Sequence, residues 1–251
     1  MTIDFISSSM NKKLLFIILG ILALTGAIFF ALLSHQAETP QLTQVQPPAA
    51  AAPAVNLDEL KTKAEAGDAA AQIQLGWAYE KGSGVKTDMK AAVKWFHQAA
   101  DQNAPEALAA LGELTQAGQG TKRDLTEAAR LYRLAAEKGS VAGQYNLAYL
   151  YEQGSGVDRN EKEAAHWYQL AAEGGDPLAQ FDIGQRCLLG VGIATNQVEA
   201  LKWLTLAAAQ GQADSGRLQA ELKSRLSSAE ITEASRLARE FVVRAAPGAA
   251  K

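Results

Sequence analysis

The chain has few residues of the kinds that build reactive or covalently held sites. Of its 251 residues, one is cysteine, Cys187, and three are histidine, His35, His97 and His166. A single cysteine excludes an internal disulfide and cannot form a zinc site by itself. The histidines do not combine with Cys, Asp or Glu at the spacing of metal ligands or of a catalytic triad. We therefore predict no catalytic residue, no bound metal and no cofactor.

Proline and excess charge are also scarce. Seven prolines and a charged fraction of 20% accompany a hydrophobic fraction of 48%, a composition that favours close-packed helices. The formal net charge is −3, so the chain has no general attraction to nucleic acid. We expect neither a nucleic-acid partner nor a small-molecule substrate.

Residues 14–33 form an uncharged apolar run of twenty residues. A helix of about 20 apolar residues crosses the roughly 30 Å of hydrocarbon in a bilayer. Lys12 and Lys13 precede the run and the next basic residue is Lys61, so the positive-inside rule places residues 1–13 in the cytoplasm. We predict an uncleaved single-pass anchor. The alternative is a cleaved signal peptide, although the run is long and SHQAET is a poor cleavage site.

Residues 34–55 contain four prolines among Ala, Gln and Thr and show no helical or strand periodicity. This composition predicts a linker. At about 3.1 Å per residue in extended form, it could hold the following domain up to roughly 70 Å from the membrane.

From residue 56 the sequence repeats with a period of 36 residues, as in the column Leu75, Leu111, Leu147 and Ile183. A fixed period in this range indicates a stacked repeat array. We predict an all-α solenoid at residues 56–245. It has four full repeats and additional capping helices at both ends, followed by a disordered tail at 246–251. The repeats cover residues 68–103, 104–139, 140–175 and 176–211.

Each repeat divides into two helices at a Gly-x-Gly turn such as Gly154-Ser155-Gly156. N-cap residues predict the start of every second helix, at Asp88, Asp124, Asn160 and Asn196. The first helices are marked in the same way by Asp68, Ser140 and Asp176. Small residues at 76, 112, 148 and 184 allow close approach of the backbones, and we expect bulk from the column Trp95, Leu131, Trp167 and Trp203.

The pattern resembles the Sel-one-like repeat family, a branch of the tetratricopeptide-type solenoids. In the first repeat the matching residues are Ala71-Gln72, Leu75-Gly76, Tyr79, Gly82, Gly84-Val85, Asp88, Ala92, Trp95 and Ala99-Ala100. Repeat two departs most, with Leu108, Thr115, Thr121 and Leu131. The resemblance implies a right-handed superhelix that serves as a docking surface for other proteins. Similar exported bacterial proteins take part in envelope assembly, motility, host interaction and protection against toxins.

The candidate partner-binding residues lie on the first helices, which line the concave side of a tetratricopeptide-like superhelix. Aromatic, apolar and polar residues occupy positions that the family leaves variable, and Tyr and Trp are typical interface anchors. The alternative is that these side chains pack between repeats. The predicted groove consists of Ile73, Trp77, Tyr145, Asn146, Tyr149, Phe181, Asp182 and Gln185.

A second candidate surface is a basic ladder directly before the Trp column. It would bind an acidic partner segment or lipid headgroups, and the alternative is a solvated face. Its members are Lys94, Arg130, His166 and Lys202. Cys187 falls at a core position of its repeat, where we expect a buried, inert thiol.

These features favour a non-enzymatic scaffold anchored in a bacterial inner membrane, with its solenoid in the periplasm bound to another envelope protein. A narrower version is an immunity protein that occludes an incoming toxin such as a phospholipase or a wall hydrolase. A structural tether in a secretion or motility machine and an envelope hydrolase are the further alternatives. The hydrolase lacks a visible nucleophile and base.

Overall fold

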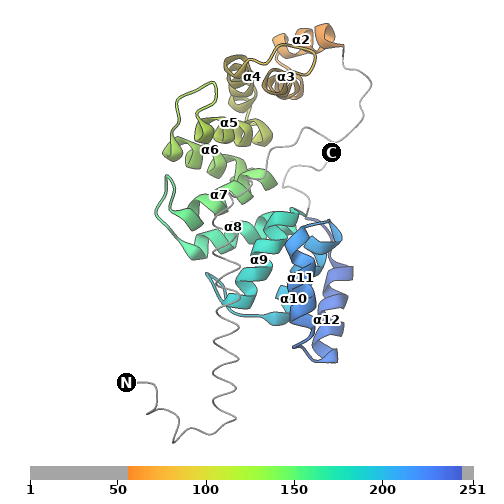
Figure 1. Cartoon of the computed structure of the whole chain (residues 1–251). Helices are drawn as coiled ribbons and strands as arrows, with labels where there is room; N and C mark the ends of the chain where they lie inside the picture. Colours follow the sequence, from red (N-terminus) through yellow and green to blue (C-terminus); the bar gives the residue numbers. More distant parts are fainter. Residues whose placement is uncertain (1–55, 245–251) are drawn as a thin grey trace, which may run out of the picture. The chain divides into compact units, whose positions relative to one another are not determined.

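The computed structural model describes residues 56–244, and every regular element in this part of the chain is an α-helix (Figure 1). The prediction of an all-helical solenoid is confirmed. The helices are α2 (Leu57–Glu65), α3 (Ala69–Lys81), α4 (Met89–Asp101), α5 (Pro105–Ala117), α6 (Leu125–Glu137), α7 (Val141–Gln153), α8 (Glu161–Glu173), α9 (Pro177–Leu189), α10 (Gln197–Ala209), α11 (Ala213–Lys223) and α12 (Ser228–Glu240).

Three predicted segments lie outside the described residues: the membrane helix at 14–33, the linker at 34–55 and the tail at 246–251. Within 56–244, no helix is both long enough and apolar enough to cross a membrane. The membrane anchor therefore stays a prediction.

Local capping explains where the second helices begin. In each one a side-chain oxygen accepts two backbone N–H groups of the first turn, which otherwise lack partners in a helix. At Asp124, for example, Oδ1 accepts the N–H groups of Thr126 and Glu127 at 3.0 Å. The four predicted caps, Asp88, Asp124, Asn160 and Asn196, are confirmed.

The first helices begin and end by the same local chemistry. Asp68, Ser140 and Asp176 cap them as predicted, whereas Ala104 makes no side-chain cap and is followed by Pro105 at the first helical position. All four end at a glycine in the left-handed conformation, namely Gly82, Gly118, Gly154 and Gly190.

Within a repeat, small residues on the first helix face large rings on the second. A Cβ atom added to Gly76 would lie 2.6 Å from the Phe96 ring, and one added to Gly112 would lie 2.7 Å from the Tyr132 ring. The bulk opposite the small column therefore comes from Phe96, Tyr132 and their equivalents, one residue after the Trp column. The Trp column does not face the small residues, but Leu131, Trp167 and Trp203 of this column are buried in the core, whereas Trp95 is half-buried.

Adjacent repeats are joined by the second glycine of the turn. A Cβ atom on Gly156 would lie 2.2 Å from the carbonyl oxygen of Leu125 at the start of α6. A Cβ atom on Gly192 would lie even closer to the carbonyl oxygen of Glu161. Gly84, which has no complete repeat before it, has nothing within 4 Å. The turn thus places each loop against the helix start of the preceding repeat.

Buried glutamines form a second contact between repeats. Gln144 and Gln180 each donate a side-chain hydrogen bond to a carbonyl oxygen near the end of the preceding second helix, at Ala136 and Ala172. Repeat 2 has Leu108 at this position, and that leucine is buried. An apolar contact therefore replaces the hydrogen bond in the repeat that departs most from the family pattern.

The array ends in helices that differ from the internal ones. Helix α2 packs on α3 through Leu60 and Ala64, and α12 packs on α10 with Ala234 fully buried. A capping box formed by Ser227 and Glu230 begins α12. Phe241 follows the end of this last helix in an extended conformation, with φ −64° and ψ 126°.

Candidate functional site

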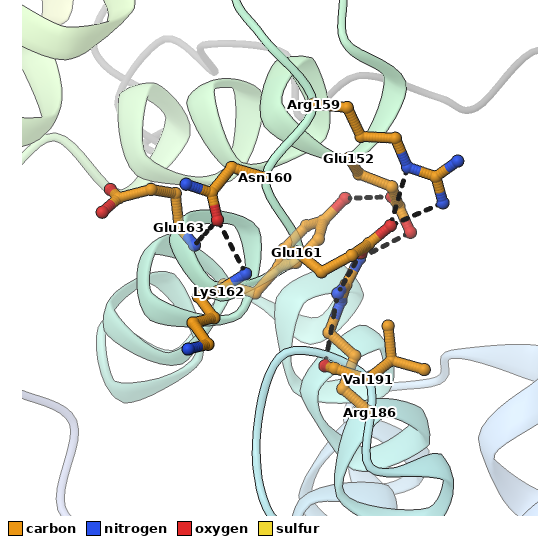
Figure 2. A network of polar contacts seen from close by, with 9 residues as sticks. Glu152, Arg159, Asn160, Glu161, Lys162, Glu163, Arg186 and Val191 are labelled. Carbon is orange, nitrogen blue, oxygen red and sulfur yellow. Dashed lines mark hydrogen bonds and ion pairs between the residues drawn. The ribbon is translucent and has the colours of Figure 1, made fainter.

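A group of charged side chains around the buried Arg186 joins repeat 3 (α7 and α8) to repeat 4 (α9 and α10), as Figure 2 shows. Arg186 on α9 has a side chain that is only 5% exposed. Its Nη2 lies 2.6 Å from Glu152 Oε1 on α7, and its Nη1 lies 2.9 Å from Glu161 Oε2 at the start of α8. Each charge of this junction cluster therefore has a partner, as burial of charge requires.

Tyr168 extends the junction cluster into the core. Its hydroxyl donates to Glu152 Oε2 at 2.9 Å, and the guanidinium carbon of Arg186 lies 5.1 Å from the centre of its ring. On the outer side, Arg159 donates to Glu161 at 2.6 Å and 2.9 Å. The cluster thus links three helices and the α7–α8 loop through hydrogen bonds to charged groups, which are stronger than neutral ones.

Asp182 is the most perturbed acid of this region. Burial, followed by the negative charge of Glu152, raises the pKa of its carboxyl group from 3.8 to about 8. The hydroxyl of Tyr145 hydrogen-bonds this carboxyl group, and the Tyr145 ring meets Tyr168 edge to face at 5.3 Å. Because its pKa lies above 7, the Asp182 carboxyl group is mostly protonated at neutral pH, and its side chain is only partly exposed.

Sequence reasoning missed Arg186 and its two glutamates. The available signal was a column of equivalent positions that reads Ala78, Leu114, Leu150 and Arg186, in which only the last residue is charged. All four positions are buried. A charged residue at a position that is apolar in its sibling repeats indicates a paired, buried charge.

The predicted groove is largely part of the core. The structure buries Ile73, Trp77, Tyr145, Asn146 and Phe181, so the outward orientation predicted for them is wrong. The cause is packing within and between repeats. Trp77, for example, meets Phe96 of its own repeat edge to face at 6.3 Å. Only Tyr149, Asp182 and Gln185 keep partial exposure, and their role in partner binding stays a prediction.

The basic ladder is not a uniform positive surface. Arg130 is paired with Glu127 at 2.7 Å, and Lys202 is paired with Glu199 at 3.2 Å. The Lys202 side chain is 15% exposed, and its Nζ lies 4.0 Å from the centre of the Trp203 ring. Lys94 and His166 are exposed beside Trp95 and Trp167. Binding of an acidic partner or of lipid headgroups by these four residues stays a prediction.

The described residues carry no arrangement suited to metal chemistry. Across 56–244, no three His, Cys, Asp or Glu residues lie close enough together to hold a metal ion. Cys187 is buried, as predicted, and burial raises the pKa of its thiol to about 11. A thiol that stays protonated at neutral pH is a poor nucleophile.

The paired helices and their stacked order define an α-solenoid repeat protein. Four consecutive stretches, residues 69–103, 105–140, 141–176 and 177–212, match the Sel1 repeat. The chain belongs to the Sel1 repeat family. Proteins of this family generally serve as protein-interaction scaffolds without enzymatic activity.

Among the solved structures with this fold are a Sel1 repeat protein and a protective antigen. A Sel1 repeat protein from Oxalobacter formigenes has a TM-score of 0.64 and 32% identity, with 75% of this chain covering 80% of that one. A protective antigen of uropathogenic Escherichia coli, described as displaying an SLR fold, has a TM-score of 0.66 and 29% identity. That match covers 77% of this chain and 42% of the antigen.

A curated relative is similar over a short stretch. The secretory immunoglobulin A-binding protein EsiB of Escherichia coli is 47% identical over 45 residues, which are 18% of this chain and 9% of EsiB. The chain therefore spans only a small part of that relative.

Proposed function

We propose that this chain is a non-enzymatic scaffold whose solenoid binds another protein of the bacterial envelope. The observation that carries the proposal is the array of four Sel1 repeats, which places helix pairs side by side in an extended stack. Such arrays typically bind partners over a long surface that several repeats supply together. The proposal is also consistent with the paired charges around Arg186 and with the protonated thiol of Cys187, which are more typical of structural residues than of catalytic ones.

Within this array, the partly exposed residues of the first helices are our candidates for partner contact. Tyr149 on α7 and Gln185 on α9 occupy equivalent positions in repeats 3 and 4 and remain partly exposed. Tyrosine offers a large, rigid contact area at small entropic cost. Arg186, the residue after Gln185, pairs with Glu152 and Glu161 and so joins the two repeats.

Photo-crosslinking in cells tests the proposal. A photoreactive amino acid at position 149 should capture a specific protein, whereas the same group at Lys162, an exposed position on α8, should not. Equal capture at both positions, or none at 149 and 185, would count against binding through the first helices. Capture of a toxin would favour the narrower hypothesis of an immunity protein.

The location of the scaffold is a separate part of the proposal. Residues 14–33 would anchor the chain in the inner membrane, with residues 1–13 in the cytoplasm and the solenoid in the periplasm. Membrane fractionation and protease treatment of spheroplasts test this topology. Digestion of the solenoid in intact spheroplasts is expected, and a fully protected solenoid would contradict the proposed orientation.

A further inference from the structure

The chain does not end its ordered path at the last helix. After α12, Phe241 is extended, and residues 241–244 lead outside any helix back to the end of α8, one repeat away. We call Phe241–Arg244 the strap. Its final backbone N–H, at Arg244, donates to the carbonyl oxygen of Glu173 at 2.8 Å. This bond satisfies a carbonyl group in the last turn of α8, which has no partner within the helix.

The first anchor of the strap is aromatic. The Phe241 ring meets Trp203 edge to face, with centres 5.4 Å apart and planes at 74°. The ammonium group of Lys202 lies 4.0 Å from the centre of the Trp203 ring and 5.9 Å from that of Phe241. Edge-to-face packing and a cation over the rings are both favourable.

The second anchor is polar. Arg244 Nη1 lies 2.9 Å from Glu173 Oε2 at the end of α8, where the helix dipole also favours a positive charge. Beside it, a Cβ atom on Gly175 would lie 3.2 Å from a methyl group of Val243. At the equivalent glycines 67 and 211, such an atom would have nothing within 4 Å.

Between these anchors the strap is loosely held. Val242 is 82% exposed and Val243 is 56% exposed, and they are the only large hydrophobic residues exposed to this degree within 56–244. The Arg244 side chain is 70% exposed. Two anchors with few contacts between them give a segment that a better-fitting chain can displace.

We propose that the surface under the strap is a docking site for an extended segment of a partner protein. The site consists of Lys202, Trp203, Glu173 and Gly175. It selects the chemistry that the strap itself displays: an aromatic residue, then β-branched residues, then an arginine whose backbone N–H reaches the Glu173 carbonyl. The strap covers the site until the partner segment displaces it. This inference rests on the proposed protein-binding function and assigns it a place and a ligand class.

A peptide-binding experiment on the full chain tests the site. The variant Phe241→Ala/Arg244→Ala releases both anchors, and the probe is a fluorescent peptide with the sequence of residues 239–246, REFVVRAA. We expect the released variant to bind the probe at least about tenfold more tightly than the wild type, whose site is covered. Equal binding by both proteins, or no binding by the released variant, would overturn the proposal.

Matched controls locate the bound probe. In the released variant, Glu173→Gln should weaken binding about tenfold or more, because the carboxylate that pairs with arginine is lost. Glu137→Gln, which changes the exposed equivalent residue one repeat earlier, should have no effect. Equal effects of the two substitutions would place the probe elsewhere and contradict the site.

A second variant guards against loss of structure. Circular dichroism and a cooperative thermal transition establish that the released variant is folded. If it is not, Arg244→Glu replaces it, since this change repels Glu173 and keeps the contact between Phe241 and Trp203. The same tenfold gain in probe binding is expected, and its absence in a folded Arg244→Glu chain would refute the strap's role.

Two further outcomes separate this inference from the proposed function. In one outcome, the chain crosslinks to a partner but the released variant does not bind the probe. This result would refute the proposed site under the strap and leave the proposed scaffold function intact. Sedimentation of the wild type tests whether the strap of one copy occupies the site of another copy. Strap-dependent dimers of the wild type would mean that the occupant is a second copy, which overturns the assignment to a partner segment.

Discussion

Two neighbouring junctions of the array have the same backbone and opposite chemistry. Between repeats 2 and 3, the equivalent positions hold Leu150, Gln116, Leu125 and Tyr132. Between repeats 3 and 4 they hold Arg186, Glu152, Glu161 and Tyr168. The tyrosine hydroxyl makes the same hydrogen bond in both, to Gln116 at 3.0 Å and to Glu152 at 2.9 Å. The repeat geometry therefore tolerates a neutral set and a charged set, provided that each set is complete.

Completeness matters because burial makes an unpaired charge costly. Leu150 and Arg186 are both buried, at 0% and 5% exposed. A leucine needs only apolar contacts there, whereas the guanidinium group needs both carboxylates. The charged junction thus depends on three residues from three helices, and the neutral junction does not.

The largest effect is expected when the charged set is broken. Arg186→Leu introduces the residue of the neighbouring junction but removes the cation that faces Glu152 and Glu161. Breaking a buried ion pair from one side costs about 3–5 kcal/mol. We expect a loss in the free energy of unfolding at the lower end of this range, because the side chains of the two glutamates that lose Arg186 are 32% and 28% exposed. Chemical denaturation measures it.

The matched control converts the whole set. The triple variant Arg186→Leu/Glu152→Gln/Glu161→Leu reproduces the neutral junction, and its stability should return to within about 1 kcal/mol of the wild type or exceed it. A triple variant as unstable as Arg186→Leu alone would show that the two junctions are not interchangeable.

The next largest change in stability is expected to differ between a loop inside the array and the loop of the first repeat. Gly156→Ala forces a Cβ atom against the Leu125 carbonyl oxygen, whereas Gly84→Ala meets nothing. Both glycines have similar positive φ values, 73° and 76°, so the backbone strain of about 1–2 kcal/mol is common to them. Overpacking should add about 1–3 kcal/mol at Gly156 only. Thermal denaturation compares the two, and equal losses would contradict the contact between repeats.

A smaller effect is expected from the pH dependence of repeat 4. Since the folded-state pKa of Asp182 is about 8, the folded chain holds a proton between about pH 4 and pH 8 that the unfolded chain has released. This contribution to stability is present at low pH and is lost as the pH rises through about 8. The change Asp182→Asn introduces the residue found at the equivalent position 146. The substitution should raise the free energy of unfolding more at pH 8 than at pH 5, by up to about 1.4 kcal/mol for each pH unit between the two pKa values.

Urea denaturation at several pH values measures this difference between the two proteins. The substitution leaves in place the acids and bases that interact with Asp182, which are Glu152, Asp176, Arg186, Tyr145 and Tyr168. A wild-type stability that does not decline between pH 5 and pH 8 relative to Asp182→Asn would contradict the protonated state.

The smallest changes in stability are expected at two residues of the basic ladder, Arg130 and Lys202. The Arg130 and Glu127 side chains are 58% and 42% exposed, so Arg130→Ala should change stability by no more than about 0.5 kcal/mol. Lys202→Ala also removes the cation over the Trp203 ring and should cost about 1 kcal/mol. Denaturation of the two variants in the same buffer measures the order, and a reversed order would contradict the packing of Lys202 under the strap.

Capping residues and glycines in the sequence predicted the ends of the helices well. Asp124 and Asn160 cap their helices because a short polar side chain can reach the free N–H groups of its own first turn, an interaction within four residues. The left-handed glycines, such as Gly154, are local for the same reason. The groove was predicted less well, because whether Tyr145 or Phe181 faces solvent depends on which helix comes next to it.

The sequence by itself determined the period, the two helices of each repeat and their ends, since caps, turns and close-packed small residues recur in every copy. Only the tertiary structure decided which variable residues are surface and which are core. It brought Arg186 to Glu152, 34 positions apart, and Arg244 to Glu173, 71 positions apart. Side chains so distant in the chain meet because the repeats stack and the strap runs back over them. Their pairing follows from burial and charge in three dimensions, which no periodicity encodes.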